Sequence, residues 1–102
     1  MESRHWSRDR QPRNTLIKNE IGYGKTIAEF EVDRGHWHGL ERHEVTTTGL
    51  IKIYAIKTND LVTVLIARPN QIKKLYTDNG RVAPEDLLQL AYEHQRKGYN
   101  QI

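Results

Sequence analysis

Two neighbouring β-prone segments joined by a polar turn constrain this fold more than any other feature of the sequence. In residues 50–56 apolar and polar side chains alternate, and in residues 61–68 nearly every side chain is apolar. The residues between them, 57–60, are polar and suit a turn. This pattern predicts an antiparallel hairpin, and the apolar second strand is expected to be covered on both faces. Pro69 ends that strand, because proline has no N–H to donate to a sheet.

A helix near the C-terminus is the other element with a clear pattern. Pro84 suits the first turn of a helix, and Glu85 and Asp86 after it favour the positive end of the helix dipole. Gly98 suits the position that follows the last turn. The face expected to pack on the rest of the protein consists of Leu87, Leu88, Leu90, Ala91 and His94.

The remaining segments complete an α+β fold. Residues 26–32 alternate like a strand, although their composition also suits a helix. Residues 33–41 have no periodicity and are expected to form a loop, and residues 70–76 form one or two helical turns. We therefore predict a small antiparallel sheet of three or four strands, packed with the C-terminal helix and one or two short helices. Residues 1–14 are expected to be a basic flexible tail, and residues 15–102 a single domain.

The composition limits the classes of function. Lysine and arginine number 16 against 13 aspartate and glutamate, giving a net charge of +3, and the isoelectric point is about 9.3. This modest excess suits contact with phosphate groups. The chain has no cysteine, which excludes disulfides, zinc ribbons and thiol catalysis. It has no apolar run near the ~20 residues that span a bilayer, and no secretory pattern at its start, so we expect a cytoplasmic protein without a membrane partner.

A histidine cluster is the leading candidate site. His36, His38 and His43 lie within eight residues, next to two glycines and Trp37. Histidine exchanges protons near neutral pH, and two such groups with a nearby cation suffice to cleave RNA through its 2′-hydroxyl. Two alternatives stay open. The histidines are surface residues of a loop, or they bind zinc.

An iron or manganese site of the cupin type fits the cluster poorly. The H-x-H pattern with a nearby glutamate resembles that motif, but Glu41 and Glu44 are wrongly spaced from His38 and the second cupin motif is missing. No metal or other cofactor is therefore assigned.

Basic and aromatic residues elsewhere suggest a nucleic-acid surface. Arg68, at the end of the apolar strand, is expected to steady the phosphate during cleavage, and Thr63 within that strand is a further catalytic candidate. The alternative is that Arg68 only marks the exit of the strand into solvent. The residues expected to bind nucleic acid are Trp37, Arg42, Lys52, Tyr54, Lys73, Lys74, Tyr76, Arg8 and Arg10.

The segment from residue 42 to residue 68 resembles the small endoribonuclease superfamily that includes barnase, EndoU, the tRNA-cleaving colicins and RelE-type toxins. The similarity lies in an apolar strand, a polar turn and a second strand containing Val62 and Thr63, with His43 or His38 before the pair and Arg68 after it. The resemblance covers about a quarter of the chain. It implies metal-independent RNA cleavage through a 2′,3′-cyclic phosphate, in a toxin or prophage product that is paired with an inhibitor protein. Many members place their helices first, whereas the clearest helix here is C-terminal.

Three functions are consistent with these features. The first is a metal-independent endoribonuclease. The second is a module that binds nucleic acid without cleaving it, through the arginines of the tail and the lysines of the sheet. The third is a small prophage-type protein, an inhibitor or adaptor, whose C-terminal helix or edge strand contacts another protein.

Overall fold

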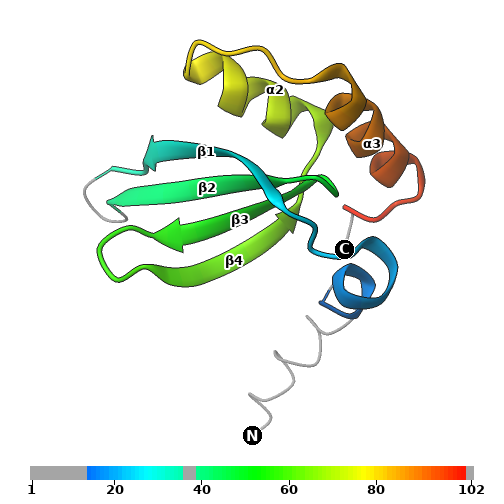
Figure 1. Ribbon diagram of the computed structural model, residues 1–102, viewed down its shortest axis with the longest axis horizontal. Coiled ribbons are helices and arrows are strands. Elements are labelled where there is room, and N and C mark those ends of the chain that lie inside the picture. Colours follow the sequence, from blue (N-terminus) through cyan, green and yellow to red (C-terminus); the bar gives the residue numbers. More distant parts are fainter. Residues whose placement is uncertain (1–13, 36–38, 101–102) are drawn as a thin grey trace, which may run out of the picture.

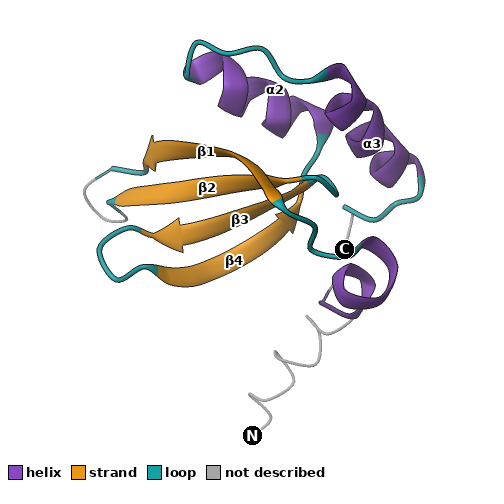
Figure 2. Cartoon of the chain, viewed as in Figure 1, coloured by secondary structure: helices purple, strands orange, loops and turns teal. Residues whose placement is uncertain are grey.

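The chain forms a four-stranded sheet with two helices packed on one of its faces (Figures 1 and 2). The computed structural model describes residues 14–35 and 39–100. The elements, in chain order, are η2 (Ile17–Ile21), β1 (Thr26–Asp33), β2 (Leu40–Thr46), β3 (Leu50–Ala55), β4 (Asp60–Ile66), α2 (Pro69–Asp78) and α3 (Glu85–Arg96). The α+β class and the antiparallel sheet predicted from the sequence are confirmed.

The sheet is a meander in which each strand pairs with its neighbour in sequence, in the order β1-β2-β3-β4. The predicted hairpin is β3 and β4, and the alternating segment 26–32 lies in strand β1. The turn between β2 and β3 contains Gly49 at a φ of 85°. A side chain here would be strained by this left-handed backbone and crowded by His94, whose Cδ2 atom would lie 3.3 Å from an added Cβ.

The main core lies between the sheet and the two helices. Alternate residues of the strands point to this face because the side-chain period of a strand is two. The aromatic rings of Phe30 on β1 and Tyr76 on α2 meet edge to face, with 4.8 Å between their centroids. The buried members of this core are Ala28, Phe30, Val45, Ile51, Ile53, Ala67, Ile72, Leu75, Tyr76, Leu87 and Ala91.

A second, smaller cluster lies at one end of the sheet. Ile17 packs there with Leu50 and Ile66, and Tyr99 covers it from the C-terminal segment. Leu50 and Ile66 are cross-strand partners. Since their neighbours in sequence belong to the main core, they point to the opposite face of the sheet. The segment around η2 therefore covers a part of the sheet that α2 and α3 leave open (Figure 1).

The helices begin and end where their sequences favour it. Pro69 occupies the first position of α2, and the side chain of Gln71 accepts a hydrogen bond of 2.7 Å from the backbone N–H of Arg68. In α3 the residues Leu87, Ala91 and His94 are buried, as predicted, and the chain then turns at Gly98 with a φ of 76°. Within the described ranges, no helix has both the length and the apolar composition needed to cross a membrane.

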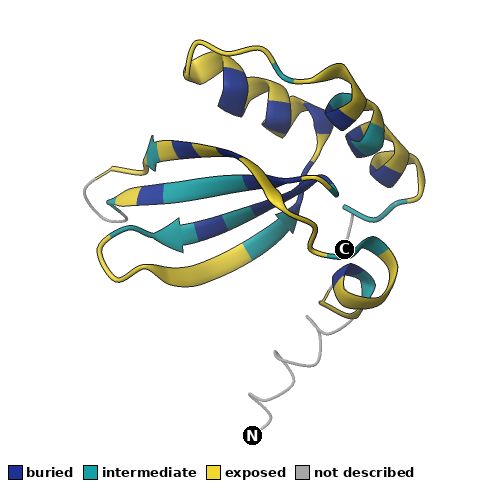
Figure 3. Cartoon of the chain, in the orientation of Figure 1, coloured by how far each residue is buried: buried dark blue, intermediate teal, exposed yellow. Residues whose placement is uncertain are grey.

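The structure corrects some predicted elements. Strand β4 is not covered on both faces: it is an edge strand, and its first four residues are exposed (Figure 3). The predicted short helical turns at 70–76 belong to a ten-residue helix, α2. Residues 33–41 are not all loop, because β1 runs to Asp33 and β2 starts at Leu40. The segment at η2 was not predicted to be helical, and the predicted tail lies almost wholly outside the described residues.

Candidate acid–base site

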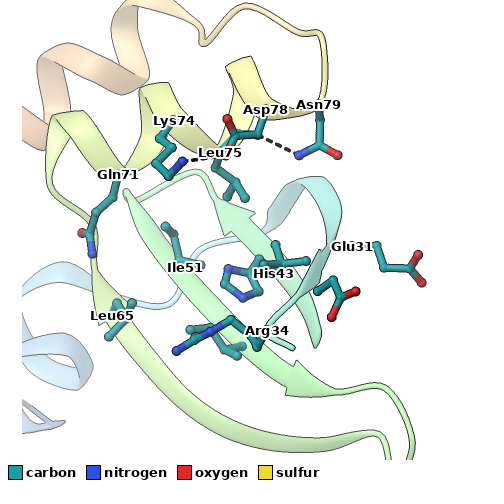
Figure 4. A pocket seen from close by; sticks show the side chains of 13 residues that line it. Glu31, Arg34, His43, Ile51, Leu65, Gln71, Lys74, Leu75, Asp78 and Asn79 are labelled. Carbon is teal, nitrogen blue, oxygen red and sulfur yellow. Dashed lines mark hydrogen bonds and ion pairs between the residues drawn. The ribbon is translucent and has the colours of Figure 1, made fainter. Parts of the chain in front are cut away.

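A cavity of about 480 Å³ lies between the core face of the sheet and helix α2 (Figure 4). Apolar side chains from strands β1, β3 and β4 and from α2 line part of it, and polar side chains of β1, β2 and α2 line the rest. The apolar members are Val32, Ile51, Ile53, Leu65 and Leu75. The polar members are Glu31, Asp33, Arg34, His43, Gln71, Lys74, Asp78 and Asn79.

Strand β2 presents His43 at this cavity and holds Glu41 beside it, although Glu41 itself does not line the cavity. Glu41 and His43 are two residues apart, so their side chains point to the same face of the sheet. The Nε2 atom of His43 lies 2.9 Å from Oε1 of Glu41, and the two side chains are only 13% and 11% exposed. An ionised carboxylate can only accept a hydrogen bond, so Nε2 donates. This fixes the ring and, in neutral histidine, leaves Nδ1 as the basic nitrogen.

Two cations border the cavity from different elements. Nη1 of Arg34, just after β1, lies 3.4 Å from the same Oε1 of Glu41. Lys74 projects from α2, where its Nζ lies 3.0 Å from Oδ2 of Asp78. Figure 4 shows Lys74 on the helix side and Arg34 on the sheet side. Both pairs are exposed at their cationic end, and such pairs are weak, so each cation is free to turn to a bound anion.

Of the three predicted catalytic residues that the structure describes, His43, Arg68 and Thr63, only His43 lines the cavity. Arg68 lies at the start of α2, where its Nη2 donates a hydrogen bond of 2.8 Å to the carbonyl oxygen of Asn100. Thr63 pairs with Ile53 in β4 but does not line the cavity. His36 and His38 lie outside the described residues. Arg34, which was not among the predicted site residues, lines the cavity instead of Arg68.

The predicted nucleic-acid residues of the sheet lie on its other face. The Arg42 guanidinium stacks 4.4 Å from the ring centroid of Tyr54, and Lys52 lies 5.6 Å from that of Tyr23. Arg42 also donates to Glu44 over 2.7 Å. Cross-strand partners of these residues include Glu29, Glu31 and Glu44. Acidic residues thus accompany both cations, and the binding of nucleic acid by this face stays a prediction from the sequence.

The other residues predicted to bind nucleic acid lie in different parts of the structure. Lys74 lines the cavity, whereas Lys73 lies 6.0 Å from the ring centroid of Tyr92, on α3. Tyr76 is a core residue that is 3% exposed, which leaves no open ring face for a base. Its burial raises its pKa, against a smaller opposing effect of the Arg81 charge. Trp37, Arg8 and Arg10 lie outside the described residues.

No pattern in the sequence points directly to Arg34 or to the hydrogen bond between Glu41 and His43. Glu41 was considered only as a metal ligand. An E-x-H spacing on a strand is the signal that would have found the pair, because residues two apart share a face. Among residues 14–35 and 39–100, no three histidine, aspartate or glutamate side chains are grouped to hold a metal ion.

Comparisons of the chain with models of protein families, with curated proteins and with solved structures found no match. The resemblance to the endoribonuclease superfamily stays a prediction from the sequence. The function is therefore argued from the cavity alone.

Proposed function

We propose that this protein is a metal-independent endoribonuclease whose active site is the cavity between the sheet and α2. The observation that supports this most is the hydrogen bond between His43 and Glu41 at a cavity bordered by Arg34 and Lys74. A histidine held by a carboxylate is an oriented general base. Two cations beside it suit a substrate that is anionic at the reacting atom.

The reaction assigns one role to each of these side chains. His43 takes the proton of the ribose 2′-hydroxyl through Nδ1, and the 2′-oxygen then bonds to phosphorus. Arg34 stabilises the charge on the phosphorane. The bond from phosphorus to the 5′-oxygen breaks, and the Lys74 ammonium gives this oxygen its proton. The products are a 2′,3′-cyclic phosphate and a 5′-hydroxyl end.

The apolar part of the cavity suits the rest of a nucleotide. Ile51, Leu65 and Leu75 line it, and a sugar or base packed there would be removed from water. Gln71 and Asn79 add amide groups to the lining, which can pair with the edge of a base. The Nδ2 atom of Asn79 already donates to the carbonyl oxygen of Leu75 over 2.8 Å, so its oxygen and its second N–H are left for a ligand.

Cleavage of a labelled RNA oligonucleotide in EDTA tests this proposal. The wild-type protein should cut RNA and leave a 2′,3′-cyclic phosphate, and it should not cut DNA or 2′-O-methyl RNA of the same sequence, because both lack the attacking hydroxyl. His43→Ala should lower the single-turnover rate by about 10²–10⁴-fold, the usual contribution of one acid–base group. RNA that stays intact with stoichiometric wild-type protein would exclude the activity.

Two adjacent lysines supply a matched control. Lys74 lines the cavity and Lys73 does not, although both are on α2. Lys74→Ala should therefore slow cleavage, whereas Lys73→Ala should leave the rate close to wild type. Equal effects of the two changes would show that α2 attracts RNA only through its total charge.

Binding without cleavage is the outcome that would favour the second function. In that case the protein retains RNA, its affinity falls steeply with added salt, and His43→Ala leaves the affinity unchanged.

A further inference from the structure

Strand β4 leaves one edge of the sheet open. Its only neighbour among the described residues is β3, and its N-terminal half is exposed on both faces (Figure 3). Leu61 is 50% exposed and Val62 is 58% exposed. An edge of this kind presents unpaired N–H and C=O groups, together with apolar side chains, to any strand that can pair with it.

The two edges of the sheet differ in charge. Strand β1, at the other edge, carries Glu29, Glu31 and Asp33, and charged side chains are a common protection of edge strands. Strand β4 carries one charged residue, Asp60, at its first position. Protection by charge is therefore present at β1 and missing over most of β4, where the β-bulge at Val62 is the protection that remains.

Five residues of β4 form a palindrome in the sequence. Residues 61–65 read Leu-Val-Thr-Val-Leu, with Thr63 at the centre. If two copies of this segment pair antiparallel about Thr63, threonine lies opposite threonine, and once the β-bulge at Val62 is straightened, valine lies opposite valine and leucine opposite leucine. Pairs of β-branched residues stabilise neighbouring strands. The two Asp60 carboxylates then lie at opposite ends of the pair and do not repel each other.

We infer that β4 is a dimerisation edge that pairs with β4 of a second copy of this chain. The two-fold axis passes beside Thr63, perpendicular to the sheet. The two sheets then join into one of eight strands, and α2 and α3 of both copies lie on the same face. The N-terminal segment of the same chain is a poorer occupant, because residues 1–13 contain four arginines, two acidic residues and a proline, and these disfavour a strand.

A single cysteine at the centre of the strand tests the pairing directly. The chain has no cysteine of its own, so Thr63→Cys carries one thiol. Directly opposite residues of an antiparallel pair lie about 4.5–5.5 Å apart at Cα, within the range that a disulfide spans. We expect mild oxidation to convert Thr63→Cys to a covalent dimer. Val82→Cys, at a loop position that is 91% exposed, should cross-link much more slowly.

A lysine at the edge provides the second test. Val62→Lys places a charge on an exposed position of β4, and Val82→Lys makes the same change outside the sheet. In sedimentation velocity over a dilution series, wild type and Val82→Lys should reach twice the monomer mass of 12.0 kDa, and Val62→Lys should remain monomeric. Circular dichroism spectra matching wild type show that each variant is folded.

Two results would overturn this inference. One is a wild-type protein that stays monomeric while Thr63→Cys cross-links no faster than Val82→Cys, as expected if the β-bulge at Val62 keeps the edge apart. The other is a wild-type dimer that Val62→Lys leaves intact, which would place the interface elsewhere. Neither result depends on RNA cleavage, so this inference and the proposed activity can fail separately.

Discussion

At the scale of single residues, the chemistry of the site depends on the charge of one carboxylate. Oε1 of Glu41 faces both the ring of His43 and the guanidinium of Arg34. Through its hydrogen bond to Nε2 it orients the imidazole. In the proposed reaction Glu41 is thus a positioning residue, which acts on the substrate only through its two neighbours.

Replacing Glu41 by glutamine tests this role. The amide oxygen can still accept the hydrogen bond from Nε2, but the negative charge is lost. Single-turnover rates of RNA cleavage should fall by about 10-fold or more, less than for His43→Ala, with little change in RNA affinity. Glu44→Gln is the matched control, because Glu44 lies on the same strand and pairs with Arg42 on the opposite face. A loss that appears only in affinity would contradict the positioning role.

Tyr76 gives the stability of the fold a dependence on alkaline pH. Burial raises its pKa above the usual 10.0, so the unfolded chain loses the phenol proton at a lower pH than the folded protein. The contribution of the neutral phenol to stability is therefore complete below pH 10.0 and is lost as pH rises through the folded pKa.

The variant Tyr76→Phe keeps the ring against Phe30 and removes the titrating group. Urea unfolding at neutral pH and above pH 10 should show that wild type loses more stability than this variant over the same interval. Parallel losses in the two proteins would mean that other groups, such as lysines, account for the whole alkaline effect.

At the scale of elements, strands could be predicted where apolar and polar residues alternate visibly in the sequence. Strands β1 and β3 alternate clearly, and the turns between strands carry polar residues and glycine, so their existence followed from local rules. The exposure of β4 could not be predicted in this way. An apolar run is the same whether the strand is central or at an edge, and only its position as the last strand of the meander decides its burial.

The packing of the segment around η2 on the sheet could not be predicted from its sequence. It is short and mostly polar, and one buried residue, Ile17, attaches it to Leu50 and Ile66. Its stability therefore comes from packing and not from helix propensity.

Ile17→Ala should for that reason destabilise the whole domain. Ile17 is 1% exposed, and removing such a side chain costs about 2–5 kcal/mol. Ile27→Ala, at a position on β1 that is 46% exposed, should cost clearly less. Chemical denaturation measures the free energy of unfolding of the two variants. Equal decreases would contradict the expected contribution of the smaller cluster at the end of the sheet to stability.

At the scale of the whole molecule, the fold class could be predicted and the site could be predicted only in part. His43 was named from its residue type, and the structure places it at a cavity. Arg68 and Arg34 are equivalent by sequence, since each follows a strand. Which of them reaches the cavity depends on the path of the chain after β4, where Arg68 is held by Asn100 instead. No local pattern contains that information.

The small cluster at the end of the sheet has a consequence for biosynthesis. The strands can pair in the order in which a ribosome releases them, because each neighbour in space is the next in sequence. Ile17 meets Leu50 and Ile66 only after β4 has emerged, and Tyr99 closes over them last. A chain whose residues up to β4 have emerged can therefore hold a paired sheet in which the cluster of Ile17, Leu50 and Ile66 still lacks Tyr99, and that interval is when a chaperone would find an apolar surface to bind.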